Sequence, residues 1–119
     1  MKKLYYAMAL AASLSFPIGC SKSVPSQDTI DIYVAKRGYT AENIKSIKRF
    51  LECSGFGYLA PNFKYDRETA FEVMMFQEAE NLKDKEGLVG KKTLEAMINR
   101  CPESSCDSSV CEGLKRIKR

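Results

Sequence analysis

The sequence predicts an all-α fold, a compact three-helix bundle stabilised by disulfides. Three observations predict it: three amphipathic stretches with helical spacing, short glycine-containing turns between them, and four cysteines within or just after these stretches. The chain has 119 residues. About a hundred remain after an N-terminal export signal is set aside, which is enough for one small domain with tails.

The first helix is predicted to follow Thr40 and to end at the glycine-rich residues 54–57. The second is predicted at about 67–80, where Asp66 or Thr69 can cap its start and Thr69 and Glu72 have the spacing of a capping box. The third is predicted over residues 91–100, after a turn formed by Gly87 and Gly90. The apolar positions that recur at helical spacing are Ile44, Ile47, Phe50 and Leu51, then Phe71, Met74, Met75, Phe76 and Ala79, then Leu94, Met97, Ile98 and Cys101.

Residues 29–35 are compatible with either a short helix or a strand. Ile30, Ile32 and Val34 alternate as in a strand, whereas Asp28 and Gly38 lie where a helix would start and stop. Both possibilities remain open. In either case we expect the segment to pack on the bundle as an N-terminal lid.

The N-terminus has the pattern of an export signal over residues 1–19. Lys2 and Lys3 precede an apolar run over residues 4–14, and small residues precede Cys20. Residues 16–21 resemble a bacterial lipobox, which implies that Cys20 is acylated and that residues 20–28 hold the lipidation site and a tether. An exported, membrane-anchored lipoprotein is therefore expected, and in a diderm host Ser21 after the cysteine resembles the signal for sorting to the periplasmic face of the outer membrane. Ordinary secretion with a free Cys20 and an uncleaved anchor are the alternatives.

Four further cysteines predict two disulfides in an oxidising compartment: Cys53, Cys101, Cys106 and Cys111. Three pairings are possible. We favour Cys53 with Cys101, at one end of the bundle, and Cys106 with Cys111 in a C-terminal loop. A zinc site is the less favoured alternative, because the cysteines form no paired C-x-x-C knuckles.

Composition disfavours catalysis. The chain has no histidine, which removes histidine-based acid–base pairs and nucleophile triads, and no cofactor or metal is expected. The formal net charge of +4 does not suggest a nucleic-acid binder. Residues 102–119 are predicted to be a disulfide-looped basic tail, either solvated or attracted to wall carboxylates and anionic lipids; its cations are Lys115, Arg116, Lys118 and Arg119.

Two related motifs lie within the helical region. Phe76 and Gln77 are followed by residues 86–94 (EGLVGKKTL), and residues 62–69 (NFKYDRET) form a looser copy ahead of the second helix. This arrangement resembles the peptidoglycan-binding-like domain, a small three-helix wall-binding module, over roughly residues 40–101 within a predicted domain of 29–101. The resemblance implies a ligand surface made by the turns and helix starts: Tyr58, Asn62, Tyr65, Asp66, Arg67, Gln77, Glu86 and Lys91.

The resemblance assigns chemistry to that surface. The two tyrosines would stack on sugar faces, Asn62 and Gln77 would hydrogen-bond amides, and Arg67 and Lys91 would pair with stem-peptide carboxylates. The function expected is that of a non-catalytic peptidoglycan-binding envelope lipoprotein that tethers or positions itself or a partner at the cell wall. The alternatives are a lipoprotein subunit of a secretion or conjugation assembly, using the same bundle to bind protein, and a small secreted effector or inhibitor.

Overall fold

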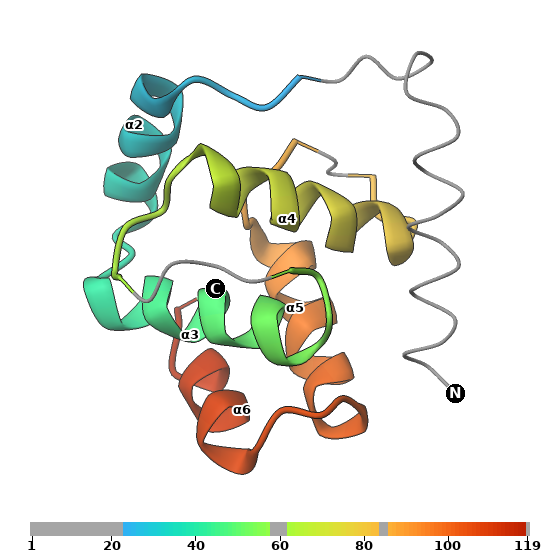
Figure 1. The fold of residues 1–119 in the computed structure, drawn as a ribbon. Coiled ribbons are helices and arrows are strands. Elements are labelled where there is room, and N and C mark those ends of the chain that lie inside the picture. The colour runs from blue at the N-terminus through green and yellow to red at the C-terminus, as the bar shows by residue number, and fades with distance from the viewer. Residues whose placement is uncertain (1–22, 58–61, 84–85, 119) are drawn as a thin grey trace.

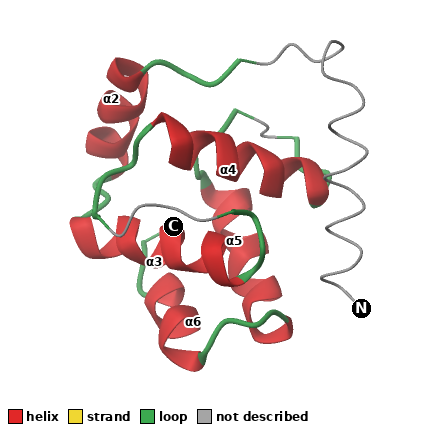
Figure 2. Ribbon diagram, viewed as in Figure 1, coloured by secondary structure: helices red, strands yellow, loops and turns green. Residues whose placement is uncertain are grey.

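The structure, a computed structural model, describes residues 23–57, 62–83 and 86–118. These residues form five α-helices, joined by loops and one short 3-10 helix and without a strand (Figures 1 and 2). The expectation of three helices is therefore wrong. The helices are α2 (Gln27–Arg37), α3 (Ala41–Cys53), α4 (Arg67–Ala79), α5 (Lys91–Arg100) and α6 (Ser108–Lys115), with the 3-10 helix η1 at Cys101–Glu103. The predicted signal segment, Cys20 and Tyr58 lie outside the described residues.

Helices α3, α4 and α5 correspond to the three predicted ones. The Thr40 hydroxyl oxygen accepts a hydrogen bond from the Asn43 N–H, and the Asn43 Oδ1 accepts one from the Thr40 N–H, which closes a capping box at the start of α3. At α4 the structure selects Asp66 over Thr69 as the cap, with the Thr69 N–H donating to Asp66 Oδ1 at 2.9 Å. Gly90 is the N-cap residue of α5 and has no side chain with which to accept a capping hydrogen bond.

The ambiguous N-terminal segment is a helix. Ser26 caps the start of α2 through the Thr29 N–H, and Gly38 ends the helix in the left-handed conformation, with φ at 74°. These local signals outweigh the strand-like alternation, and only Ile30 of the three alternating residues is fully buried. Helix α2 packs against α4, so it does cover the bundle from one side (Figure 1).

The C-terminal segment is not a simple tail, because it contains helix α6. Asp107 caps this helix by accepting from the Val110 N–H, and Val110, Leu114 and Ile117 are buried at spacings of four and three residues. Helix α6 packs along α3 and also contacts α5 (Figure 1). The basic residues Lys115, Arg116 and Lys118 remain exposed beside this buried stripe.

All four expected cysteines are in disulfides, but the favoured pairing is wrong. Cys53 bonds to Cys106, with 5.1 Å between their Cα atoms, and Cys101 bonds to Cys111, with 5.6 Å. The reason is α6: the chain turns back after η1, so Cys106 reaches the end of α3 and Cys111 on α6 meets the end of α5. Both bonds therefore hold α6 on the bundle.

The core lies where α3, α4 and α5 meet. The rings of Phe50 and Phe56 pack edge to face on Phe76, with centroids 5.4 and 5.5 Å apart. Leu94 and Met97 of α5 complete this layer and are fully buried. No helix of the described residues has the length and hydrophobicity needed to cross a bilayer.

Candidate functional site

The turn over residues 86–90 is held by buried side chains that bond its backbone. Gln77 is fully buried; its Oε1 accepts from the Gly87 N–H at 2.9 Å, and its Nε2 donates to the Leu88 carbonyl at 3.1 Å. The same Nε2 donates to Thr93 Oγ1 at 3.0 Å, which links the turn to the first turn of α5. The side chain thus satisfies backbone groups that would otherwise be buried without partners.

Three tyrosines complete this arrangement. The Tyr65 hydroxyl donates to the Gly87 carbonyl at 2.5 Å, and the hydroxyls of Tyr33 and Tyr39 donate to the Val89 carbonyl at 3.0 and 2.6 Å. Burial raises the pKa of Tyr65 well above its usual value and also raises that of Tyr39. The hydroxyls of Tyr65 and Tyr39 therefore stay protonated and act as donors to the turn.

Two residues that the resemblance placed on the ligand surface are consequently interior. Tyr65 is 2% exposed and Gln77 is 0% exposed. Their polar atoms bond the turn, so neither side chain offers a ring or an amide to a ligand. The physical reason is the demand for hydrogen-bond partners made by the buried backbone of residues 87–89.

Lys48 of α3 holds the turn before α4 through two hydrogen bonds. This lysine is only 4% exposed, and its Nζ donates to Asn62 Oδ1 at 2.6 Å and to the Lys64 carbonyl at 2.9 Å. Asn62 Oδ1 also accepts from the Lys64 N–H at 2.9 Å, as in an Asx turn. Burial lowers the pKa of Lys48, and the nearby carboxylates of Asp66 and Glu68 oppose that effect. The turn is thereby held in a defined shape.

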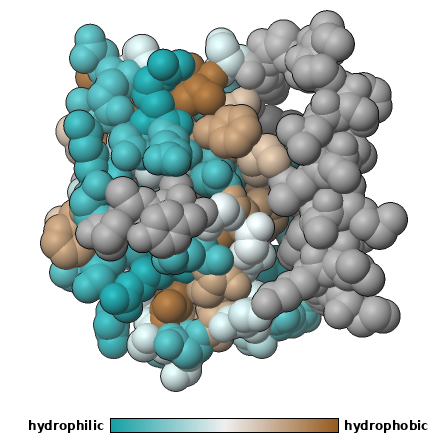
Figure 3. All heavy atoms as spheres, in the orientation of Figure 1, coloured by the Kyte–Doolittle hydropathy of each residue, from teal (hydrophilic) through white to brown (hydrophobic). Residues whose placement is uncertain are grey.

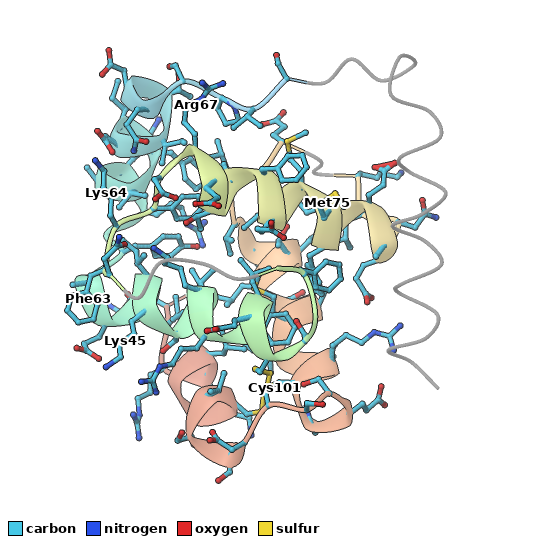
Figure 4. All side chains as sticks on the ribbon, viewed as in Figure 1. Lys45, Phe63, Lys64, Arg67, Met75 and Cys101 are labelled. Carbon is cyan, nitrogen blue, oxygen red and sulfur yellow. A yellow bond between two sulfur atoms is a disulfide. The ribbon has the colours of Figure 1, made fainter. Side chains whose placement is uncertain are left out.

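This fastened turn presents an aromatic ring at the surface. Phe63 is 49% exposed, and Lys45 Nζ lies 5.4 Å from its ring centroid. Phe63, Lys45 and Lys64 lie at the same end of the molecule (Figure 4), where a hydrophobic spot stands out in an otherwise hydrophilic region (Figure 3). We call Lys45, Asn62, Phe63 and Lys64 the Phe63 face. Phe63 and the two lysines were not among the predicted ligand contacts. The sequence signal for this face is an apolar residue between two polar ones in the segment ahead of α4.

The start of α4 holds the incoming chain. Arg67 Nε donates to the Pro25 carbonyl at 3.1 Å, and its Nη2 donates to the Val24 carbonyl at 3.3 Å. Burial alone would raise the pKa of Asp66, but hydrogen bonds from the Thr69 N–H and hydroxyl, together with Lys48, hold it below its usual value. Asp66 and Arg67 therefore have structural partners at positions where the resemblance placed ligand contacts.

The remaining predicted contacts lie on the other turn. Glu86 precedes Gly87 and Lys91 opens α5, and both side chains are exposed. Gly87 packs against the middle of α4, beside Ala70 and Met74, whereas Phe63 and Asn62 lie ahead of that helix, against α3. The structure therefore divides the predicted surface: Asn62 belongs to the Phe63 face, and Glu86 and Lys91 belong to the turn behind α4.

One carboxyl group stands apart from these networks. Glu72 on α4 packs against the backbone of Gly57, and among the described contacts its Oε1 is buried without a hydrogen-bond partner. Burial, reinforced by the neighbouring charge of Glu68, raises the pKa of Glu72 to about 7. Among the residues the structure describes, no group of three or more metal-ligating side chains forms a metal site.

The middle of the chain is similar to a known protein family. Residues 40–97 match the family model described as "Putative peptidoglycan binding domain". Neither the curated proteins nor the solved structures gave a match to the chain. The matched segment includes α3, α4, most of α5 and both turns, and it leaves α2 and α6 outside. The match supports a peptidoglycan-binding-like domain over this segment, and this family suggests a wall-binding role.

Proposed function

We propose that this protein is a non-catalytic envelope lipoprotein that binds peptidoglycan through the Phe63 face. The family of residues 40–97 is a binding domain, and all four residues of the face lie inside that segment. The observation that carries the proposal is Phe63 itself, an exposed ring on a turn that Lys48 holds to α3.

The chemistry of the face suits a glycan with short acidic peptides. An aromatic ring at 49% exposure offers a flat surface on which the apolar face of a sugar can pack. Lys45 and Lys64 supply positive charge beside it for stem-peptide carboxylates. The turn is already ordered by Lys48 and Asn62, so binding would require little loss of conformational freedom.

We further propose that residues 1–19 direct export and that Cys20 carries the acyl chains that anchor the protein, on the periplasmic face of the outer membrane. The supporting observations are the sequence pattern around Cys20 and the two disulfides, which are typical of proteins that mature in an oxidising compartment. An anchored protein with a wall-binding face would link the membrane to the wall.

The test is co-sedimentation of the purified, oxidised protein with peptidoglycan sacculi at moderate and high salt. We expect Phe63→Ala to weaken binding by about tenfold, as is common for a central aromatic contact. Lys45→Ala with Lys64→Ala should weaken binding mainly at low salt. Phe71→Ala is the matched control, because Phe71 is similarly exposed, at 45%, but lies on α4 outside the face.

The outcomes separate the functions considered. Loss of pelleting in Phe63→Ala, with Phe71→Ala unchanged, would support the Phe63 face. Equal pelleting of both variants with the wild type would place wall binding elsewhere, with Glu86 and Lys91 the next positions to change. If the folded wild type does not pellet at either salt concentration, the wall-binding proposal fails and the alternative of a protein-binding subunit of an envelope assembly is favoured.

A further inference from the structure

We propose that a stripe formed by Val24, Phe71 and Met75 is the face that this protein lays on a phospholipid surface. Phe71 and Met75 lie one turn apart on α4, and Arg67 lies one turn before them, so the three share one side of the helix. The opposite side of α4 supplies the core residues Val73 and Phe76. Phe71 is therefore left outside the bundle's core, and Val24 and Met75 pack against the core while remaining partly exposed.

The stripe is apolar and continuous with the entering chain. Phe71 is 45% exposed, and Val24 and Met75 are partly buried. Hydrophobic surface extends along the side of α4 next to the segment that precedes α2 (Figure 3), and Figure 4 shows Arg67 and Met75 on this helix. Because Arg67 bonds the carbonyls of Val24 and Pro25, the entering chain is fixed at the start of the stripe.

The length of chain before Val24 supports a lipid bilayer as the surface that the stripe contacts. This step rests on the proposed acylation of Cys20. Four residue steps separate Cys20 from Val24, and a fully extended chain covers them in about 14 Å. An acylated Cys20 would therefore hold Val24, at the start of the stripe, within that distance of the lipid headgroups. Such a short connection favours one orientation of the domain, with the stripe toward the bilayer.

The charges beside the stripe indicate which lipid surface it suits. Glu68 and Glu72 lie on the adjacent row of α4. The exposed carboxyl group of Glu68 disfavours a strongly anionic surface, so contact through Phe71 and Met75 should not require anionic lipid or low salt. The stripe would add weak apolar contacts to the anchor, and the anchor would raise their effective concentration.

The experiment uses the complete lipoprotein in phosphatidylcholine vesicles, with and without a lipid-borne quencher. The chain contains no tryptophan, so each substitution Phe71→Trp, Met75→Trp or Phe63→Trp creates a single tryptophan, whose emission can be excited apart from that of the six tyrosines. We expect the emission of Phe71→Trp and Met75→Trp to shift to the blue in vesicles and to lose intensity with the quencher. Phe63→Trp, on the proposed wall-binding face, should show neither change.

Each outcome bears on a different proposal. Flotation of the protein with vesicles, without quenching at positions 71 and 75 in folded variants, would overturn the proposed membrane face while leaving the anchor intact. Failure of the complete protein to float would overturn the anchor, and the membrane face with it. Vesicles that contain phosphatidylglycerol, at low and high salt, test whether contact is independent of anionic lipid. If positions 71 and 75 are quenched only with anionic lipid at low salt, the stripe is not the contact surface proposed.

Discussion

The side-chain oxygen of Gln77 accepts the backbone N–H of Gly87 at 2.9 Å. Through this bond and two donated ones, a single buried amide holds the turn between α4 and α5. The residue is part of the motif that resembles a wall-binding domain, yet its atoms are used within the protein. Its position in the motif is explained by folding, without a contact to ligand.

Gln77→Ala should lower the free energy of unfolding by about 3 kcal/mol. The change leaves the buried Gly87 N–H and Leu88 carbonyl without partners and removes packed side-chain volume. Urea denaturation followed by circular dichroism measures it. Asn99→Ala, at an exposed position on α5, is the control and should change stability by less than about 0.5 kcal/mol. A Gln77→Ala protein as stable as that control would show that the amide is dispensable.

Substitutions at two glycines can distinguish the cost of a side chain at positive φ from the added cost of a steric clash. Gly38 and Gly87 have similar positive φ values, 74° and 79°. A Cβ at Gly87 would lie 2.7 Å from the Ala70 carbonyl oxygen, whereas a Cβ at Gly38 would meet nothing within 4 Å. Gly38→Ala should therefore cost about 1 kcal/mol, and Gly87→Ala about 3 kcal/mol or more. Equal losses in thermal or urea denaturation would contradict the close packing of the turn on α4.

The sequence was sufficient to locate the three matched helices because each has apolar residues at helical spacing and a recognisable start. Helix α6 was not predicted because the run of cations at and after its end is typical of a solvated tail, and the helix itself has only two fully apolar positions in the core, Val110 and Leu114, followed by Ile117. The disulfide pairing depends on the direction in which α6 returns along α3. Cysteine spacing alone does not contain that information.

The site was harder to predict for a related reason. Sequence motifs identify which residues accompany a turn, but they do not say whether a polar side chain faces solvent or the turn's own backbone. Tyr65 and Gln77 face the backbone, because the buried carbonyls and N–H groups of residues 87–89 need partners. Phe63 is exposed because Lys48 and Asn62 hold its turn on the outside of α3.

The two disulfides should contribute unequally to stability. The Cys53–Cys106 bond spans 53 residues and the Cys101–Cys111 bond spans 10. On the loop-entropy estimate, Cys53→Ser with Cys106→Ser should cost about 4 kcal/mol, and Cys101→Ser with Cys111→Ser about 3 kcal/mol. Mass spectrometry of an unreduced digest checks the pairing itself. A peptide that joins Cys53 to Cys101 would contradict the structure, and equal or reversed losses would contradict the ordering.

Glu72 should make the protein less stable as the pH rises. Its pKa is about 7 in the folded protein and 4.5 in a free side chain, so the folded state holds an extra proton between these values. The stabilisation is complete below pH 4.5 and is lost as the pH rises through 7. Since the group is half-buried, solvent screening limits the loss to about 1 kcal/mol. Glu72→Gln keeps the shape without the charge, so it should match the wild type near pH 4.5 and exceed its stability at pH 8 by that amount. Urea denaturation at both pH values measures the difference, with Glu86→Gln as the exposed control. If the free energy of unfolding changes with pH by the same amount in the wild type and in Glu72→Gln, ionisation of Glu72 does not destabilise the fold.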